Sequence, residues 1–186
     1  MYSWISLDTP AGLAPDARAL RAALGRYATG VCLVTTVAPG GKREGMTINS
    51  FASVSLSPPL VLWSISNEAR SADVFLGAQR YNISVLGAAH QDLALHFARP
   101  AEDKFERCAD DFVSGRNGLP RVRGALTAYE CSVYSRHAEG DHTILIGRIE
   151  HFESADSEPL LFHAGKLGGL ADLLPAPVLA TEPKHN

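Results

Sequence analysis

Apolar and polar residues alternate most regularly between residues 46 and 57. One face of this run is apolar except for a single serine: Met46, Ile48, Ser50, Ala52, Val54 and Leu56. The other face carries four hydroxyls, one amide and one aromatic ring: Thr47, Asn49, Phe51, Ser53, Ser55 and Ser57. A period of two predicts a β-strand, because successive side chains point to opposite sides of a sheet. Pro58-Pro59 ends the strand.

Further strands are predicted where short runs of β-branched and aromatic residues stand between turn signals. These runs are residues 31–37, 60–65, 81–86, 125–134, 143–152 and 160–163. Three short helices are predicted between them. They run from Pro15 to about Tyr27, from a Ser71 cap through Leu76, and from Gln91 to Phe97.

The order of these elements predicts the fold class. Six or more strands with three short helices, and no regular strand–helix alternation, argue against a doubly wound parallel sheet. The pattern favours a mainly β fold, an antiparallel barrel with peripheral helices. We assign residues 15–170 to this one domain, with a loop-rich stretch over 100–123. Residues 1–14 and 171–186 are punctuated by prolines and are expected to be tails.

Composition excludes several classes of protein. The 186 residues are 46% apolar and carry a formal net charge of −3, without the Lys/Arg block that nucleic acid or an anionic membrane would need. No apolar run is long enough for a transmembrane helix, and the N-terminus lacks the pattern of a signal peptide. The three cysteines are far apart and form no C-x-x-C pair, as expected of reduced thiols. We therefore expect a cytoplasmic protein with neither a nucleic-acid nor a membrane partner.

Most motifs of catalysis and cofactor binding are absent from the sequence. It contains no G-x-G-x-x-G, no Walker loop, no H-E-x-x-H and no G-x-S-x-G. His137 and His142 are separated by four residues and have no third ligand nearby in sequence, so we expect no metal site.

The polar face of residues 47–57 is the first candidate binding surface. A solvent-facing strand usually carries Lys, Glu or Arg, and this face carries none. Short hydroxyl and amide groups suit uncharged hydrogen bonds to the ring edge and phosphate of a flavin. A simple solvent-facing edge strand is the alternative interpretation.

Gly140-Asp141-His142 is the second candidate, immediately before a strong strand. It is open to two interpretations: a hairpin turn, or a nicotinamide site in which His142 donates a hydrogen bond and Asp141 orients the ring. Hydride transfer needs two stacked rings and the exclusion of water rather than a strong acid or base. The lack of a catalytic dyad is therefore compatible with this chemistry.

Residues 45–62, GMTINSFASVSLSPPLVL, resemble the signature of the short-chain flavin reductases, the reductase components of two-component flavin-dependent monooxygenases. Five further stretches agree with that family in type and order: residues 27–31, 81–86, 91–98, 124–131 and 140–147. The resemblance covers about residues 20–168. It implies an FMN-binding split β-barrel, normally a homodimer with flavin sites near the subunit interface.

The resemblance also implies roles for individual residues. Those expected along the flavin ring are Thr29, Gly30, Val31, Thr47, Asn49, Ser50, Phe51 and Ser53. Those expected at the phosphate, the ribityl chain or the adenine are Ser71, Gln91, Phe97 and Lys104. His142 would face the nicotinamide as the catalytic residue, with Asp141 and Thr143 behind it. Leu167 stands where the family often has an aromatic residue, which implies a different cover for the nicotinamide pocket.

The function implied by the resemblance is an NAD(P)H:flavin oxidoreductase. Such an enzyme transfers a hydride from NADH or NADPH to FMN or FAD and supplies reduced flavin to a partner monooxygenase. The sequence has no arginine pair placed for a 2′-phosphate, which favours NADH, and it does not distinguish FMN from FAD. Two alternatives stay open: a split-barrel reductase that passes electrons to a corrinoid or a metal, and a non-catalytic flavin-binding module.

Overall fold

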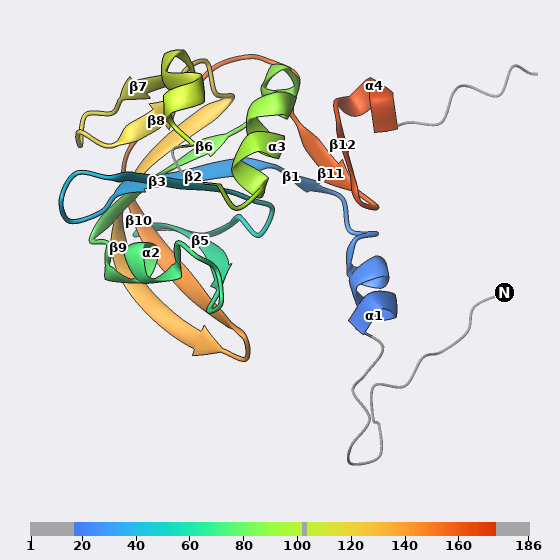
Figure 1. Cartoon of the computed structure of the whole chain (residues 1–186), viewed down its shortest axis with the longest axis horizontal. Helices are drawn as coiled ribbons and strands as arrows, with labels where there is room; N and C mark the ends of the chain where they lie inside the picture. Colours follow the sequence, from blue (N-terminus) through green and yellow to red (C-terminus); the bar gives the residue numbers. More distant parts are fainter. Residues whose placement is uncertain (1–16, 102–103, 174–186) are drawn as a thin grey trace, which may run out of the picture.

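A coiled, seven-stranded antiparallel sheet forms the body of the protein in the computed structural model, which describes residues 17–101 and 104–173 (Figure 1). Its strands lie in the order β3-β2-β6-β9-β10-β5-β4. In chain order they are β2 (Cys32–Val37), β3 (Arg43–Ile48), β4 (Ala52–Leu56), β5 (Pro59–Ser66), β6 (Arg80–Val85), β9 (Thr127–Glu139) and β10 (His142–Ser154). Every pairing in this sheet is antiparallel, so the predicted mainly β, barrel-like architecture is confirmed.

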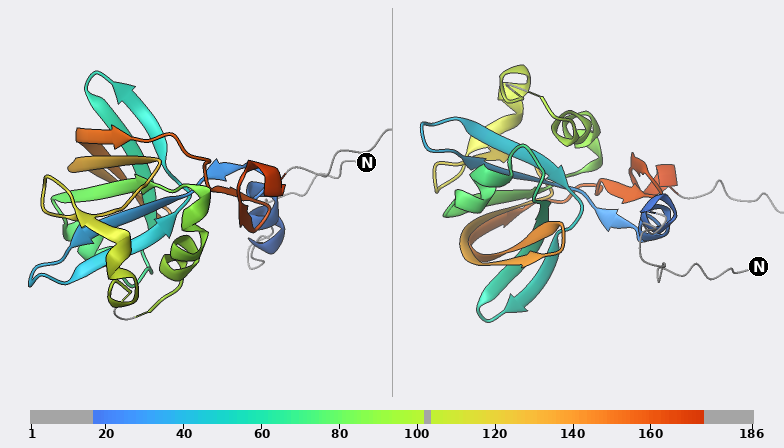
Figure 2. Two further views of the ribbon diagram at one scale, coloured as in Figure 1. Left: turned by 90° about the horizontal axis from the view of Figure 1, so that it is seen from above. Right: turned by 60° about the horizontal axis from the view of Figure 1, so that its bottom comes forward.

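A smaller unit, which we call the arm, lies to one side of the barrel (Figures 1 and 2). It consists of residues 17–30 and 161–173. Its three strands, β1 (Thr29–Gly30), β11 (Leu161–His163) and β12 (Lys166–Gly168), pair in the order β1-β11-β12, and the helices α1 (Ala17–Leu24) and α4 (Leu170–Leu173) flank them. The arm thus joins two segments that are more than 130 positions apart in the sequence, through pairs such as Thr29 with Phe162.

Two helices and one hairpin pack against the barrel. The helices are α2 (Ala72–Gly77) and α3 (Gln91–Ala98), and the hairpin joins β7 (Phe112–Ser114) to β8 (Pro120–Val122). Short 3₁₀ turns span Ala88–His90 and Glu106–Asp111. Among the described residues, no helix has the length and apolar character that crossing a membrane requires.

The apolar core has two parts. The first fills the barrel around Trp63, whose ring meets Phe75 and Tyr81 edge to face at centroid distances of 5.2 and 5.6 Å. The second lies beneath α3, where Phe97 packs against Phe105 and Phe112. These two clusters fix β3 and α3 on the barrel.

The alternating run over residues 46–57 is two strands rather than one. β3 ends at Ile48 and β4 begins at Ala52, because Ser50 leaves the ladder and hydrogen-bonds the backbone of Ser64 on β5. The apolar face of this run is also not wholly buried. β4 is an edge strand, and on it Val54 is 46% and Leu56 95% exposed.

Other boundaries also differ from those predicted. The first helix ends at Leu24 rather than about Tyr27, and Pro15 lies outside the described residues. The stretch 100–123 contains the β7–β8 hairpin, and α4 extends past residue 170. Residues 1–14 of the predicted N-terminal tail and 174–186 of the C-terminal tail are likewise outside the described residues.

Candidate functional site

A largely apolar hollow of about 510 Å³ opens between β3, α3 and the arm. We call it the ring hollow. Its lining is Val31, Thr47, Ile48, Asn49, Gln91, Leu95, Ala98, Phe162, Gly165, Lys166 and Leu167. The α3 residues in this set follow helical spacing, since Gln91, Leu95 and Ala98 lie on one face while Leu93, Ala94 and Phe97 face the core.

A second hollow of about 720 Å³ continues from the first toward α1. We call it the arginine hollow, because Arg18, Arg21 and Arg26 are among its lining residues. The two hollows share Asn49, Phe162 and Gly165. Together they form one groove that is apolar at one end and cationic at the other. Such a groove suits a ligand with a flat ring and an anionic tail.

The hydroxyl proton of Thr47 is used in a hydrogen bond within the protein. Its Oγ1, on the half-buried side chain, donates to the carbonyl oxygen of Ala94 at 2.7 Å and so ties β3 to α3. A hydroxyl has one proton and two lone pairs. Toward a ligand in the ring hollow, Thr47 is therefore an acceptor only.

Thr29, on the neighbouring strand β1, has a buried hydroxyl with no hydrogen-bond partner among the described residues. A buried hydroxyl without a partner is costly, so a polar ligand atom would be favourable there. The side chain belongs to the strand that pairs with Phe162 of the groove lining. Gly30 follows with an exposed backbone, and Val31 is buried at the wall of the ring hollow.

The residues between β3 and β4 are anchored to the barrel. The Ser50 hydroxyl accepts a hydrogen bond from the Ser64 amide at 3.0 Å and donates to the Ser64 carbonyl at 3.3 Å. The ring of Phe51 stacks on Tyr129 with a centroid distance of 5.7 Å. These contacts fix the connection between β3 and β4, of which only Asn49 lines the ring hollow, whereas Ser53 is exposed on β4.

His142 opens β10 and lies opposite Ser66 of β5. Its Nδ1 is 2.7 Å from Asp141 Oδ1, and this hydrogen bond holds the pKa of the exposed Asp141 carboxyl below its ordinary value. Behind it, Thr143 Oγ1 donates to Asn67 Oδ1 at 2.7 Å. The predicted arrangement of Asp141 beside the imidazole is therefore present.

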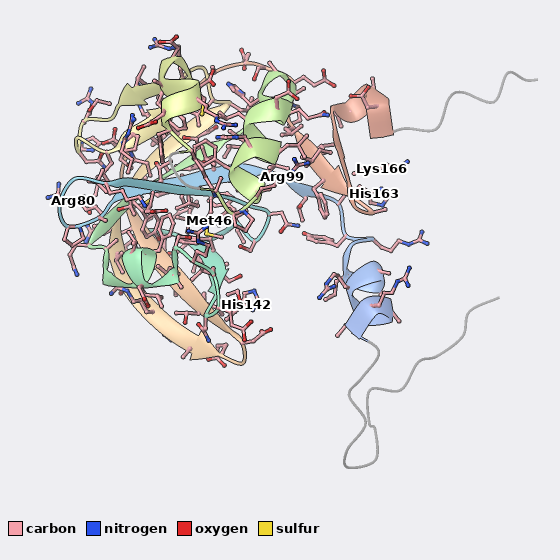
Figure 3. The ribbon with its side chains drawn as sticks, in the orientation of Figure 1. Met46, Arg80, Arg99, His142, His163 and Lys166 are labelled. Carbon is pink, nitrogen blue, oxygen red and sulfur yellow. The ribbon has the colours of Figure 1, made fainter. Side chains whose placement is uncertain are left out.

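The structure does not bring His142 into the lining of the ring hollow. Figure 3 shows it at the turn between β9 and β10, apart from His163 and Lys166 on the arm. β5 connects His142 to the region of the ring hollow. Ser64 on β5 is hydrogen-bonded to Ser50, and Ser66, two residues further along the same strand, lies opposite His142.

Three predicted contacts lie elsewhere. Phe97 is 1% exposed and belongs to the core, so its ring is not presented to the groove. Ser71 precedes α2 but makes no capping hydrogen bond, and its hydroxyl points to the Met46 sulfur at 3.8 Å. The six-residue helix α2 therefore lacks the Ser71 side-chain cap that was expected at its N-terminus, where the phosphate site was predicted.

Lys104 is also directed away from the groove. Its Nζ donates to the carbonyls of Phe97 at 3.2 Å and Gly45 at 3.5 Å, and it lies over the Phe97 ring. Burial lowers the pKa of this ammonium group, with the Glu44 carboxylate opposing that shift. The side chain lines a separate hollow of about 220 Å³ beside Arg43.

Several groove residues were not predicted from sequence. They are Arg18, Arg21, Arg26, Leu95, Phe162 and Lys166. Most of these residues reach the groove only because β1 pairs with β11. Strands of two and three residues are too short to show a periodic pattern, so the sequence does not predict this pairing. Leu95 could have been predicted from the sequence, because it lies four residues after Gln91 and therefore on the same face of the helix.

Comparison with known proteins gives one consistent result. A family model described as "Flavin reductase like domain" matches residues 24–171. The chain is 42% identical over 153 residues to the NADH-dependent flavin reductase of Rhodococcus sp., covering 81% of this chain and 85% of that protein. Among solved structures, Streptomyces globisporus C-1027 NADH:FAD oxidoreductase SgcE6, in complex with NAD and FAD fragments, superposes with a TM-score of 0.81 at 32% identity, over 96% of this chain and 99% of that one.

A further relative is a subunit of a larger system. The chain is 37% identical over 148 residues, 80% of its length, to the reductase component of the flavin-dependent trigonelline monooxygenase of Acinetobacter baylyi (strain ATCC 33305 / BD413 / ADP1). The chain spans about half the length of that relative (47%) and of the first curated relative that it matches (48%).

Proposed function

The chain belongs to the flavin reductase-like domain family, and from this premise we propose that it is an NADH-dependent flavin reductase. In this reaction a hydride passes from the nicotinamide of NADH to a flavin, FMN or FAD. The ring hollow is the feature that supports the proposal most directly. It offers an apolar slot beside short hydroxyl and amide groups, the environment in which a flat, uncharged ring with polar edges is bound.

The residues present fit a flavin. An oxidised flavin ring has one N–H, at N3, flanked by two carbonyl oxygens. Thr47 is free to accept from that N–H, since its own proton is held by Ala94, and the exposed Asn49 amide can donate to a carbonyl. The unpartnered Thr29 hydroxyl is a further polar group beside the groove. A bound flavin supplies the ring that accepts the hydride.

The chain's own contribution is to bind, orient and keep water out. Leu95 from α3 and Leu167 from β12 both line the ring hollow and give it apolar surface. His142, oriented by Asp141, is proposed to hold the nicotinamide carboxamide or phosphate at the far end of the β5 face. The family resemblance supports this role.

We also propose that two copies of the chain form a homodimer. Large apolar side chains are exposed on the arm and on the edge strand: Leu24 at 67%, Tyr27 at 77% and Leu56 at 95%. A second copy would cover them. Light scattering on the purified protein would then give twice the chain mass of 19.9 kDa, and a mass of one chain would contradict the dimer.

The proposed acceptor of the reduced flavin is a separate flavin-dependent monooxygenase, by analogy with the Acinetobacter reductase component. Reduced flavin must then leave the protein. Under anaerobic conditions, excess NADH should reduce many equivalents of free flavin per protein chain. Reduction of one equivalent only would contradict release.

The decisive test of the reductase activity is aerobic NADH oxidation by the purified protein with FMN, FAD or no flavin added. Catalytic oxidation that requires flavin would support the proposal, and the relative rates would identify the preferred flavin. NADPH in place of NADH tests the choice of donor. If the protein binds flavin but oxidises neither donor, it is a binding module and the proposal is wrong.

A further inference from the structure

A polar pocket of about 390 Å³ lies on the outside of the barrel, between the strands β6, β9 and β10 and the turn of the β7–β8 hairpin. We call it the outer pocket. It shares no lining residue with the ring hollow or the arginine hollow. Figure 3 shows Arg80 on the opposite side of the barrel from His163 and Lys166 of the arm. Charged and hydroxyl-bearing side chains predominate in its lining: Arg80, Arg116, Glu130, Ser132, Glu150 and His151.

The strand β10 is irregular where it lines the outer pocket. Its ladder with β9 shifts register between Ile149 and His151, so that Glu150 is an extra residue, a β-bulge. Successive residues of a regular strand point to opposite faces of a sheet, yet Glu150 and His151 both line the pocket. The bulge therefore directs two consecutive polar side chains to one place, which is a common use of bulges beside functional sites.

A buried carboxylate fixes the turn that closes the pocket. Glu130 is 6% exposed, and its oxygens accept hydrogen bonds from the backbone amides of Arg116 at 2.8 Å and Asn117 at 3.2 Å. The Nδ1 atom of His151 lies 3.7 Å from the same carboxylate. A Cβ atom at Gly115 would lie 2.7 Å from Glu130 Oε1, so the turn approaches this closely because residue 115 is a glycine. Arg116 is thereby held over the pocket.

The charged groups at the rim are only partly used within the protein. The Ser132 hydroxyl donates to Glu150 Oε1 at 2.7 Å and so positions this carboxylate. The guanidinium groups of Arg80 and Arg116 have no hydrogen bond or ion pair with any described residue. Arg121 on the same hairpin, by contrast, forms an ion pair with Glu153. The outer pocket thus presents two unpaired cations and one positioned carboxylate.

This arrangement of charges selects a class of ligand. A guanidinium group binds a carboxylate through its planar fork of N–H donors, and a carboxylate binds an ammonium group. A simple anion would be repelled by Glu150, and a simple cation by Arg80 and Arg116. A small molecule that carries both charges satisfies all three side chains.

We propose that the outer pocket binds a small zwitterion of the α-amino acid class. Its carboxylate is bound by Arg80 and Arg116, and its ammonium group by Glu150. The inference goes beyond the proposed function and does not depend on it, since the pocket and the groove have no lining residue in common.

The test is isothermal titration calorimetry of the full chain with a panel of neutral L-amino acids, in the absence of flavin and NADH. The amino acid that binds best is then compared with its deaminated acid and its decarboxylated amine, which each lack one charge. The variants are Arg80→Gln/Arg116→Gln and Glu150→Gln. The matched control is Arg99→Gln/Arg107→Gln, which removes two exposed arginines that do not line the pocket.

We expect the amino acid to bind at least tenfold more tightly than either analogue. Each variant should weaken its binding about tenfold, the size of one lost hydrogen bond between charged groups, and the control should bind it normally. Arg80→Lys/Arg116→Lys keeps the charge without the fork and should give an intermediate loss. Saturating FMN should leave the affinity unchanged.

Four results would overturn the inference. No amino acid of the panel could bind, or the deaminated acid could bind as tightly as the amino acid, which would make the pocket a simple anion site. The arginine variant could bind the amino acid unchanged, or FMN could compete with it. The three altered side chains are exposed, so the variants should keep the melting temperature of the unaltered protein. If the double variant does not fold, Arg80→Gln and Arg116→Gln are measured singly.

Discussion

Replacing Thr47 by valine removes one hydroxyl from the wall of the ring hollow and leaves the shape of the side chain nearly unchanged. Two effects follow from the structure. The 2.7 Å hydrogen bond from Thr47 Oγ1 to the Ala94 carbonyl is lost, and so is the oxygen that could accept a hydrogen bond from a ligand in the ring hollow. The first effect acts on stability and the second on flavin binding.

The stability effect is small. A neutral hydrogen bond contributes about 0.5–1.5 kcal/mol net, and a chain of this size loses roughly 2–4 °C in melting temperature per kcal/mol. We therefore expect Thr47→Val to melt about 1–6 °C below the unaltered protein. Thr47→Ser keeps the hydroxyl and should restore most of that loss.

The binding effect has a specific signature, because Thr47 can only accept. If it accepts from the flavin N3–H, Thr47→Val should raise the dissociation constant of riboflavin about 2- to 12-fold. The same substitution should have little effect on 3-methylriboflavin, which has no N–H at that position. The two changes would then be non-additive, as expected of groups in direct contact.

The assay is fluorescence quenching with both ligands and with Thr47→Val, Thr47→Ser and the unaltered chain. Equal weakening of riboflavin and its 3-methyl derivative would refute the assignment of Thr47 to N3. Unchanged riboflavin binding together with a lower melting temperature would show that Thr47 only ties β3 to α3.

The other predictions concern the proposed nicotinamide site, the core and a half-buried charge. His142→Ala should raise the Michaelis constant for NADH about tenfold in steady-state kinetics and leave the flavin dissociation constant unchanged, with His137→Ala on β9 as the control; collapse of flavin binding would contradict the role given to His142. Gly147→Ala should cost about 1–3 kcal/mol in urea unfolding, because the added methyl group would overlap the Tyr81 hydroxyl, whereas Gly77→Ala meets no atom within 4 Å and should be neutral or slightly stabilising. Burial lowers the pKa of Lys104 below its ordinary 10.5, so at this side chain the folded state binds fewer protons than the unfolded chain, and its contribution to stability rises as the pH approaches 10.5. Burial raises the pKa of the Cys32 and Cys131 thiols, which act in the opposite direction over the same pH range. The measurable quantity is therefore a difference: unfolding experiments at neutral pH and about pH 10 should show that the stability of the unaltered protein relative to Lys104→Gln increases with pH.

The sheet was predictable because most of its strands are short, regular and separated by turn residues, although β9 and β10 have 13 residues each and extend beyond the predicted runs 125–134 and 143–152. The break after Ile48 was not, since the alternation continues through Asn49, Ser50 and Phe51 without a Gly or Pro. What ends β3 is the bond between Ser50 and the backbone of Ser64, and a contact fourteen positions away leaves no local signal.

The candidate site was predicted in part, for similar reasons. Val31, Thr47 and Asn49, which the resemblance places along the flavin ring, line the ring hollow, and so does Gln91, which was expected at the ribityl chain or the adenine. Phe97 does not, because on α3 it shares the buried face of Leu93, and that four-residue spacing was visible in the sequence. The arginine hollow was not predicted, since it exists only when the two ends of the described chain meet in the arm.

The most direct test of the reductase proposal is anaerobic reduction of flavin by NADH in the presence of the protein, followed by the loss of oxidised flavin absorbance. We predict complete bleaching at a rate that is proportional to protein concentration and far above that of NADH and flavin alone. Flavin that binds the protein yet stays oxidised in the presence of NADH would contradict the account.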